Sequence, residues 1–292
     1  MKFVTFAHGD VEAPGLWLDG KGVLDLGSVA HDLLGIIEGG AAAMAAVQAL
    51  ADGPAVAIPA RDVRLLAPIP RPRKNVFCVG RNYVEHVKEG ARFGGAAGGP
   101  VKLPEVPQFF TKAPTTVNAP GAPVRLDATL TKLLDYEVEL AVIIGKAGRD
   151  IPKARAYEHV FGYTVANDVT ARDLQRRHDQ WFKGKSLDTT CPLGPWIVTA
   201  DQIGDPTTLE LSLTVNGQER QRATADMMIF DIPTIIEFLS AGLTLEPGDI
   251  IATGTPSGVG YAMDPPVGLK DGDVVTAKID RIGELVSPIV GV

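Results

Sequence analysis

Residues 134–146 read LDYEVELAVIIGK and combine an apolar strand with closely spaced carboxylates. Alternate residues of a strand point to the same face, so Glu137 and Glu139 should project together, with Asp135 in the same register. The intervening apolar residues, from Val138 onward, should then face an apolar layer. Two neighbouring carboxylates repel each other, which favours either a cation between them or protonation of one. A solvated strand face is the alternative that a lone Glu-x-Glu pattern favours.

A second apolar segment, FGYTVAND (161–168), ends on a third carboxylate, Asp168. Three carboxylates without clustered His or Cys suit a hard cation, Mg²⁺ or Mn²⁺, and argue against zinc. The metal-ligand set is therefore Glu137, Glu139 and Asp168, which leaves coordination positions on Mg²⁺ for water and a chelating substrate. Capping of the helix expected after residue 170 is an equally open role for Asp168.

The bulk composition narrows the class of protein. The 292 residues carry a formal charge of −7 without a long Lys/Arg run, so we expect no nucleic-acid partner. We also expect no membrane span, because no uninterrupted run of 18 apolar residues occurs. The N-terminus lacks the apolar region of a signal peptide, and the only cysteines, Cys78 and Cys191, fit two buried thiols. These features predict a cytoplasmic protein.

Residues 1–69 and 70–292 differ in pattern. The first range predicts a small N-terminal α/β domain, with helices that end at glycines. A stretch rich in Pro and basic residues, LLAPIPRPRKN (65–75), is the best linker candidate. The second range consists mainly of short apolar strands separated by Gly, Pro and Asp. We therefore predict an α+β, mostly β fold with a small N-terminal domain.

Local signals place several elements within the larger domain. Asn216-Gly217 suits a type I′ turn in a β-hairpin, and Asp231 is placed to cap a helix. Helices are expected near residues 83–88, 152–159, 170–177 and 232–239. The glycine-rich stretch GARFGGAAGGP (90–100) predicts a flexible loop or lid, with a plain surface linker as the alternative.

Seven stretches in the second range resemble the fumarylacetoacetate hydrolase family. They are GRNYVEHVKE (80–89), LDYEVELAVIIGK (134–146), GYTVANDVTARDLQ (162–175), KSLDTTCPLGPW (185–196), VNGQERQ (215–221), LEPGDIIATGTPSGVG (245–260) and LKDGDVV (269–275). The resemblance covers nearly all of residues 70–292 and implies a mixed β-sandwich roll that commonly forms homodimers. It also implies that the acidic triad, Glu137, Glu139 and Asp168, holds Mg²⁺ or Mn²⁺.

The resemblance implies catalytic roles for three residues outside the triad. His86 and Glu89 fall on the family's lid segment, where such a pair acts on a water or on a substrate proton. Their spacing of three puts them on one face of a helix, and the carboxylate would orient the imidazole and raise its basicity. Lys185 aligns with a lysine that faces the substrate. Without the resemblance, an exposed His-Glu pair and a solvated basic turn are the alternatives.

Four further positions are implied to bind substrate. Arg172 and Gln175 lie in the helix after Asp168, where the family's polar side chains reach toward the substrate. Thr255 aligns with a residue that contacts the substrate carboxylate. Its loop, which includes Gly254, also offers backbone N–H and hydroxyl donors to an anion.

These residues predict a divalent-metal enzyme that acts on a small 2-keto acid. The leading expectation is hydrolysis of a C–C bond in a 2,4-diketo acid such as an acylpyruvate, through a metal-stabilised enolate. The alternative is an isomerase, tautomerase or decarboxylase acting on a 2-hydroxymuconate-type substrate or on oxaloacetate. A non-catalytic ligand-binding member of the family is the third possibility.

Overall fold

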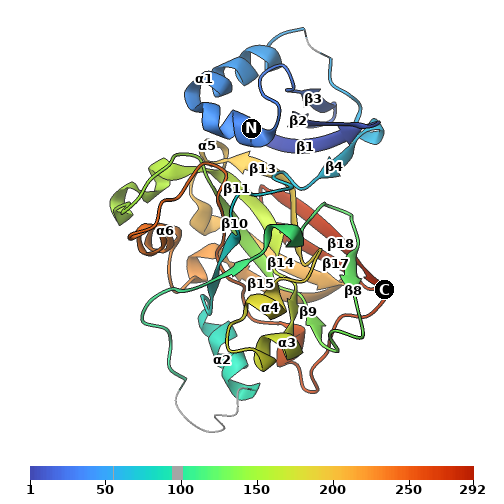
Figure 1. The fold of residues 1–292 in the computed structure, drawn as a ribbon, viewed down its shortest axis with the longest axis vertical. Helices are drawn as coiled ribbons and strands as arrows, with labels where there is room; N and C mark the ends of the chain where they lie inside the picture. The colour runs from blue at the N-terminus through green and yellow to red at the C-terminus, as the bar shows by residue number, and fades with distance from the viewer. Residues whose placement is uncertain (55, 94–100) are drawn as a thin grey trace.

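The computed structural model describes residues 1–54, 56–93 and 101–292 (Figure 1). The predicted loop at 90–100 therefore falls largely outside the described residues. Within these ranges the chain forms an eleven-stranded mixed sheet, a five-stranded sheet and one two-stranded sheet. This mostly β architecture with a few short helices confirms the predicted fold class.

The eleven-stranded sheet carries the candidate site. Its strands, in spatial order, are β3 (Gly22–Asp25), β2 (Val11–Leu18), β1 (Lys2–His8), β13 (Cys191–Thr199), β11 (Val160–Asn167), β10 (Val138–Ile144), β16 (Ile250–Ala252), β5 (Val76–Gly80) and β6 (Gln108–Lys112). Two short strands branch from this path, β4 (Arg64–Leu66) on β1 and β7 (Val117–Asn118) on β13. The β16–β5 and β13–β7 pairs are parallel and the others antiparallel, which makes the sheet mixed.

The five-stranded sheet runs in the order β15 (Gln218–Thr224), β14 (Glu210–Val215), β17 (Val274–Ile279), β18 (Gly283–Gly291) and β8 (Val124–Leu126). The two-stranded sheet pairs β9 (Leu134–Asp135) with β12 (Thr170–Ala171). The helices are α1 (Leu33–Ala51), α2 (Val84–Phe93), α3 (Arg172–Arg177), α4 (Phe182–Lys185), α5 (Ala200–Ile203) and α6 (Ile232–Ser240). Short 3₁₀ turns are Ala60–Asp62, Pro114–Thr116, Lys153–His159, Pro206–Thr208, Ala225–Met227 and Gly260–Ala262.

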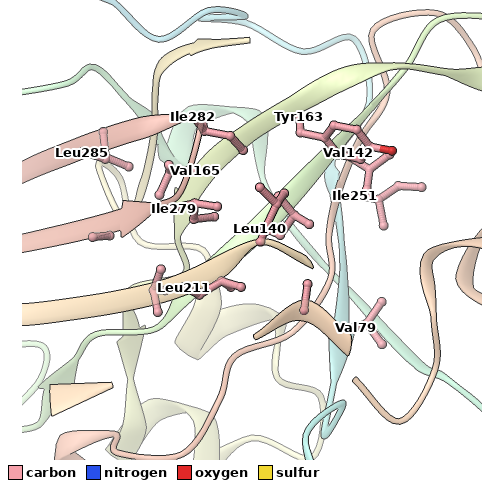
Figure 2. Packing of buried hydrophobic residues seen from close by; sticks show 14 of the residues in the cluster. Val79, Leu140, Val142, Tyr163, Val165, Leu211, Ile251, Ile279, Ile282 and Leu285 are labelled. Carbon is pink, nitrogen blue, oxygen red and sulfur yellow. The ribbon is translucent and has the colours of Figure 1, made fainter. Parts of the chain in front are cut away.

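Strand β10 is buried on both faces. Leu140 and Val142 pack with Leu211 and Ile279 of the five-stranded sheet (Figure 2). The intervening residues, such as Ile143, belong to a second core cluster that also contains residues of α1. The prediction that Val138, Leu140 and Val142 face an apolar layer is confirmed. A solvated strand face, the alternative for the two glutamates, is excluded because Glu137 and Glu139 are only 4% and 1% exposed.

Two local predictions are confirmed by backbone geometry. Asn216 and Gly217 have φ of +52° and +77°, the left-handed conformation that a type I′ turn requires at both central positions. They connect β14 to β15, which form an antiparallel hairpin. Asp231 accepts a hydrogen bond from the backbone N–H of Thr234 and so caps α6.

The N-terminal segment shares the large sheet instead of forming a separate one. Its strand β1 pairs with β13 of the remainder of the chain, and its helix α1 is interrupted at Gly40, where φ is +53°. By length and composition alone α1 could cross a membrane. It is interrupted, however, and Ile36 and Ile37 are buried in the core. The boundary near residue 70 stays a prediction.

Candidate active site

Three carboxylates converge at one end of β10. Glu137, Glu139 and Asp168 each offer an oxygen, and these oxygens lie within 4.8 Å of one another. Their side chains are at most 5% exposed, so water cannot screen their mutual repulsion effectively. We refer to them as the acidic triad. Their convergence is what the sequence predicted, although Asp168 follows Glu139 by 29 positions in the chain.

Two hydrogen bonds hold the segment that contains Glu137 beside the segment that contains Asp168. Asp168 donates its backbone N–H to the carbonyl of Glu137 at 2.9 Å. Asn167 accepts the backbone N–H of Glu137 through its side-chain oxygen at 3.1 Å. The chain is therefore pinned at both strand ends, immediately beside the carboxylates.

The predicted continuous strand through Asp135 needs correction. The strand is broken at Tyr136 and Glu137, since the Glu137 N–H bonds to the side chain of Asn167 and not to the sheet. Asp135 consequently does not join the triad. Its carboxylate accepts hydrogen bonds from Arg172 and from the backbone of the 260–261 turn.

Three buried cations, which we call the basic trio, surround the triad. Lys185 places its Nζ 2.8 Å from Glu137 and 2.6 Å from Asp168. Lys112 lies 2.7 Å from the other oxygen of Asp168, and Arg172 lies 2.6 Å from Glu137. All three are at most 6% exposed. A buried charge is stable only when it is paired, so these contacts hold the triad together.

The basic trio stabilises the ionised forms of the three carboxylates to different extents, so their pKa values shift differently. Burial disfavours the charged form of Glu137, but Lys185 and Arg172 outweigh it and lower the pKa of Glu137 to about 2. Burial, reinforced by repulsion from Asp168 and Glu137, raises the pKa of Glu139 well above its usual value. Gly254 gives Glu139 one backbone N–H at 2.8 Å, which opposes this rise only in part. Among the residues that the structure describes, Glu139 is thus the member of the triad without a directly paired cation.

This donor set fits a divalent hard cation. The triad supplies only oxygen ligands, and Glu139 is the member whose ionisation a cation would favour. With Asp135 included, and with Glu139 ionised as cation binding would require, four buried carboxylates would face the three cations of the trio, an excess of one negative charge. A divalent ion would reverse this sign and make the centre attractive to an organic acid.

Asp168 does not cap the following helix. Helix α3 begins at Arg172, two residues later than a start at Thr170 would require, and Ala171 occupies the cap position without a side-chain hydrogen bond. Both oxygens of Asp168 instead contact lysines. Of the two roles that the sequence left open, the structure excludes the cap, and the metal-ligand role stays a prediction.

His86 and Glu89 form the pair that helical spacing predicted. On α2, His86 Nδ1 lies 2.8 Å from Glu89 Oε1, and the second oxygen of Glu89 accepts the backbone N–H of Gly258 at 2.9 Å. Both side chains are about one-sixth exposed, so this is not a fully solvated surface pair. His86 also lies close enough to Glu137 to help lower its pKa.

The predicted substrate-binding residues line the same region, and several also build the scaffold. Arg172 uses its guanidinium to pair with Asp135 and Glu137, and it donates to Gln175 at 3.2 Å. Thr255 accepts a hydrogen bond from Gln221 at 2.8 Å. Contact of these residues with a substrate stays a prediction.

Sequence reasoning missed two polar residues at the site. Lys112, at the end of the apolar strand QFFTK, is fully buried and pairs with Asp168. Gln221, within the quoted stretch VNGQERQ, is 1% exposed and bonds to Val138, which lies between the two glutamates. A charged or amide side chain inside a buried strand was the available signal, but only the fold shows what each one contacts.

The cysteines take no part in this chemistry. Both are buried and free, as predicted. Burial raises the pKa of the Cys191 thiol to about 12 and that of Cys78 well above its usual value. Such thiols are inert at neutral pH.

A family model for the C-terminal domain of fumarylacetoacetate hydrolase matches residues 75–290, which is most of the chain and includes the whole site. The chain belongs to the fumarylacetoacetate hydrolase family. It is an enzyme family with hydrolase, isomerase and tautomerase members, and the resemblance noted in the sequence is confirmed.

Individual members of the family share both the site region and the fold. Oxaloacetate tautomerase YisK of Bacillus subtilis is 53% identical over 228 residues, 78% of this chain and 73% of that protein. The solved structure of a fumarylacetoacetate hydrolase from Exiguobacterium antarcticum is 41% identical, covers 100% of both chains and has a TM-score of 0.83. A maleylpyruvate hydrolase from Sphingobium, solved with manganese(II) and pyruvate, is 31% identical, covers 100% of this chain and 99% of its own, and has a TM-score of 0.81.

Proposed function

We propose that this protein is a divalent-metal-dependent tautomerase that interconverts the keto and enol forms of a 2-keto acid, with oxaloacetate as the first substrate to test. The proposal rests mainly on the His86–Glu89 pair beside the acidic triad. It is supported by the 53% identity to an oxaloacetate tautomerase. The hydrolase reading that the sequence favoured first is less well supported, because the relative with the highest identity given above is a tautomerase.

The acidic triad would hold Mg²⁺ or Mn²⁺. When bound, the ion would withdraw electron density from the 2-keto group and make the neighbouring C3 proton more acidic. Manganese(II) with pyruvate in the related maleylpyruvate hydrolase supports this choice of metal and of ligand class.

His86 would move the proton. With Glu89 Oε1 as the acceptor of their hydrogen bond, His86 Nδ1 would carry the hydrogen and Nε2 would be left as the base. Nε2 would take the proton from C3 while the C2–C3 double bond forms, and the protonated His86 would then give that proton to the 2-oxygen. No atom is gained or lost, as tautomerisation requires. Gly258 holds Glu89 in place for this step.

Other residues of the chain would hold the acid. Thr255, in the loop whose Gly254 contacts Glu139, would donate its hydroxyl to the substrate carboxylate. Gln175, anchored by Arg172, would contact the far end of the substrate. Lys185 remains charged, because Asp168 and Glu137 raise its pKa despite burial, and it would act as a fixed positive group.

Hydrolysis of a 2,4-diketo acid is the second candidate. The fold match to a maleylpyruvate hydrolase supports it, and the same His86–Glu89 pair would then activate a water. The two reactions share the metal and differ in whether a C–C bond breaks.

One experiment separates these functions. With Mg²⁺ present, ultraviolet absorbance of the enol should show that the protein accelerates oxaloacetate equilibration, and EDTA should abolish the effect. Acetylpyruvate cleavage and pyruvate release from oxaloacetate, followed in parallel, should be far slower. Faster cleavage of acetylpyruvate would contradict the tautomerase proposal in favour of hydrolysis. Tight oxalate binding without turnover of any substrate would favour a ligand-binding member.

The expected homodimer and cytoplasmic location stay predictions. Sedimentation equilibrium of the purified protein tests the first of these.

A further inference from the structure

The side-chain amide of Gln221 connects three parts of the site. Its Oε1 accepts the backbone N–H of Val138 at 2.9 Å, between the two glutamates of the triad. Its Nε2 donates to Thr255 Oγ1 and to the carbonyl of Pro256, both at 2.8 Å. Gln221 lies on β15 of the five-stranded sheet, so it reaches the site from outside the sheet that carries the triad.

These partners determine the orientation of the amide. The Pro256 carbonyl can only accept and the Val138 N–H can only donate, so the NH₂ group must face Pro256 and the oxygen must face Val138. The NH₂ group therefore also faces Thr255, whose oxygen accepts. Rotating the amide by 180° would leave two repulsive contacts in a site that excludes water.

The hydrogen bond that Thr255 Oγ1 accepts from Gln221 restricts the direction of its own O–H group. A hydroxyl that accepts from an N–H must direct its own O–H elsewhere. Within the residues that the structure describes, Gln221 is the hydrogen-bond partner of Thr255 Oγ1. Thr255 is 3% exposed and adjoins Gly254, whose N–H contacts Glu139. Its proton is thus available next to the acidic triad.

We propose that Gln221 is a positioning residue that makes the Thr255 hydroxyl a donor to the carboxylate of the bound acid. A threonine without this contact could act as donor or acceptor, and its lone pairs would repel a carboxylate. The hydrogen bond from Gln221 excludes the orientation in which Thr255 presents its lone pairs to the ligand, before the ligand binds. The inference rests on the role given to Thr255 in the proposed function.

A double-mutant cycle tests the inference without relying on turnover. Oxalate affinity is measured by calorimetry on the Mn²⁺-loaded protein for the wild type, Gln221→Met, Thr255→Val and the double variant. Thr255→Val and Gln221→Met should each weaken oxalate binding by roughly tenfold, the size expected for one hydrogen bond to a charged group. The double variant should be no weaker than Thr255→Val alone, because Gln221 acts through that hydroxyl. Mn²⁺ affinity should be unchanged in Thr255→Val.

Additive losses in the double variant would overturn the inference, since Gln221 would then act independently of Thr255. Unchanged oxalate affinity in Gln221→Met would overturn it as well. If Gln221→Met does not fold, Gln221→Asn serves in the same cycle, because the shorter amide cannot reach Val138 and Thr255 together. Wild-type oxaloacetate turnover is measured separately. Its absence would count against the tautomerase, whereas the oxalate cycle would still decide the role of Gln221.

Discussion

The acidic triad and the His86–Glu89 pair are built in different ways. The triad lies at the adjoining ends of two paired strands of the central sheet, is almost fully buried, and is bound by the basic trio. The pair lies on α2, a helix that ends at Phe93, immediately before residues outside the described ranges, and its side chains are about one-sixth exposed. Figure 1 shows α2 near α3 and α4, at the end of the molecule away from the N-terminal segment.

This difference separates two tasks. A metal site needs ligands that are held close against their mutual repulsion, and a buried sheet with paired cations provides that rigidity. A base must approach a substrate after it has entered, which a helix at the edge of the fold permits more readily than a core strand. We therefore expect changes in the triad to act on metal affinity and changes in the pair to act on rate.

The largest effect is expected from Glu139→Ala. Removing this ligand should abolish Mn²⁺ binding and turnover while the protein stays folded, because no cation within the described part of the chain is paired directly with Glu139 and its loss leaves no buried charge unpaired. Calorimetric Mn²⁺ titration, oxaloacetate tautomerisation and circular dichroism measure the three properties. Glu89→Gln is the matched control and should retain Mn²⁺ affinity. Full activity in Glu139→Ala would exclude the metal assignment.

His86→Ala should separate rate from metal binding. Loss of a general base lowers kcat by roughly 10²–10⁴. Mn²⁺ affinity should be close to that of the wild type, since His86 lies outside the triad. Steady-state kinetics with saturating Mg²⁺ and a parallel Mn²⁺ titration provide the comparison. An unchanged kcat would remove His86 from the reaction.

Lys185→Met should alter the triad in two opposite ways. In the metal-free protein the substitution removes an ion-pair partner of both Glu137 and Asp168. Because breaking a buried ion pair costs on the order of 3–5 kcal/mol, the free energy of unfolding should fall by about that amount. Mn²⁺ should bind more tightly, because a neighbouring positive charge has been removed. Urea unfolding in EDTA and Mn²⁺ titration measure these effects, with exposed Lys183→Met as control. Weaker Mn²⁺ binding would show that Lys185 supports the ion.

The smallest effect is expected in the pH dependence of metal-free stability. The raised pKa of Glu139 means that the folded state holds this proton more tightly than the unfolded state does. Its contribution is complete below about pH 4.5 and is lost as pH rises toward the folded pKa. Glu137, lowered to about 2, contributes a constant amount above about pH 4.5.

Thermal unfolding in EDTA should therefore show Tm falling by a few degrees as the pH rises above about 4.5, because the raised pKa of Glu139 makes deprotonation cost folding free energy. Glu139→Gln should flatten this slope, because it removes the titrating group. Addition of Mn²⁺ to the wild type should also flatten it. An equal slope in Glu139→Gln would show that another group causes the pH dependence.

Local patterns in the sequence were sufficient for much of the fold. The alternation in residues 138–144 predicted which side chains of β10 pack inward, and Asn216-Gly217 predicted a hairpin. Both follow from interactions between residues close together in the chain, which the sequence displays directly. The interruption of α1 at Gly40 is local, since it lies in the backbone conformation of that glycine, whereas the break at Tyr136 and Glu137 depends on Asn167, which is distant in sequence.

The sequence by itself determined which residues could bind a metal, because three carboxylates at strand ends restrict the ion that they suit. Only the tertiary structure decided how charge is divided among them. Lys112 and Lys185 reach Asp168 from β6 and α4, and Gln221 reaches Thr255 from the other sheet. The widest of these pairings, Lys112 with Asp168, joins residues 56 positions apart, and no local period in the sequence records it. The pKa difference between Glu137 and Glu139 follows from these pairings and from burial, both of which exist only once the chain has folded.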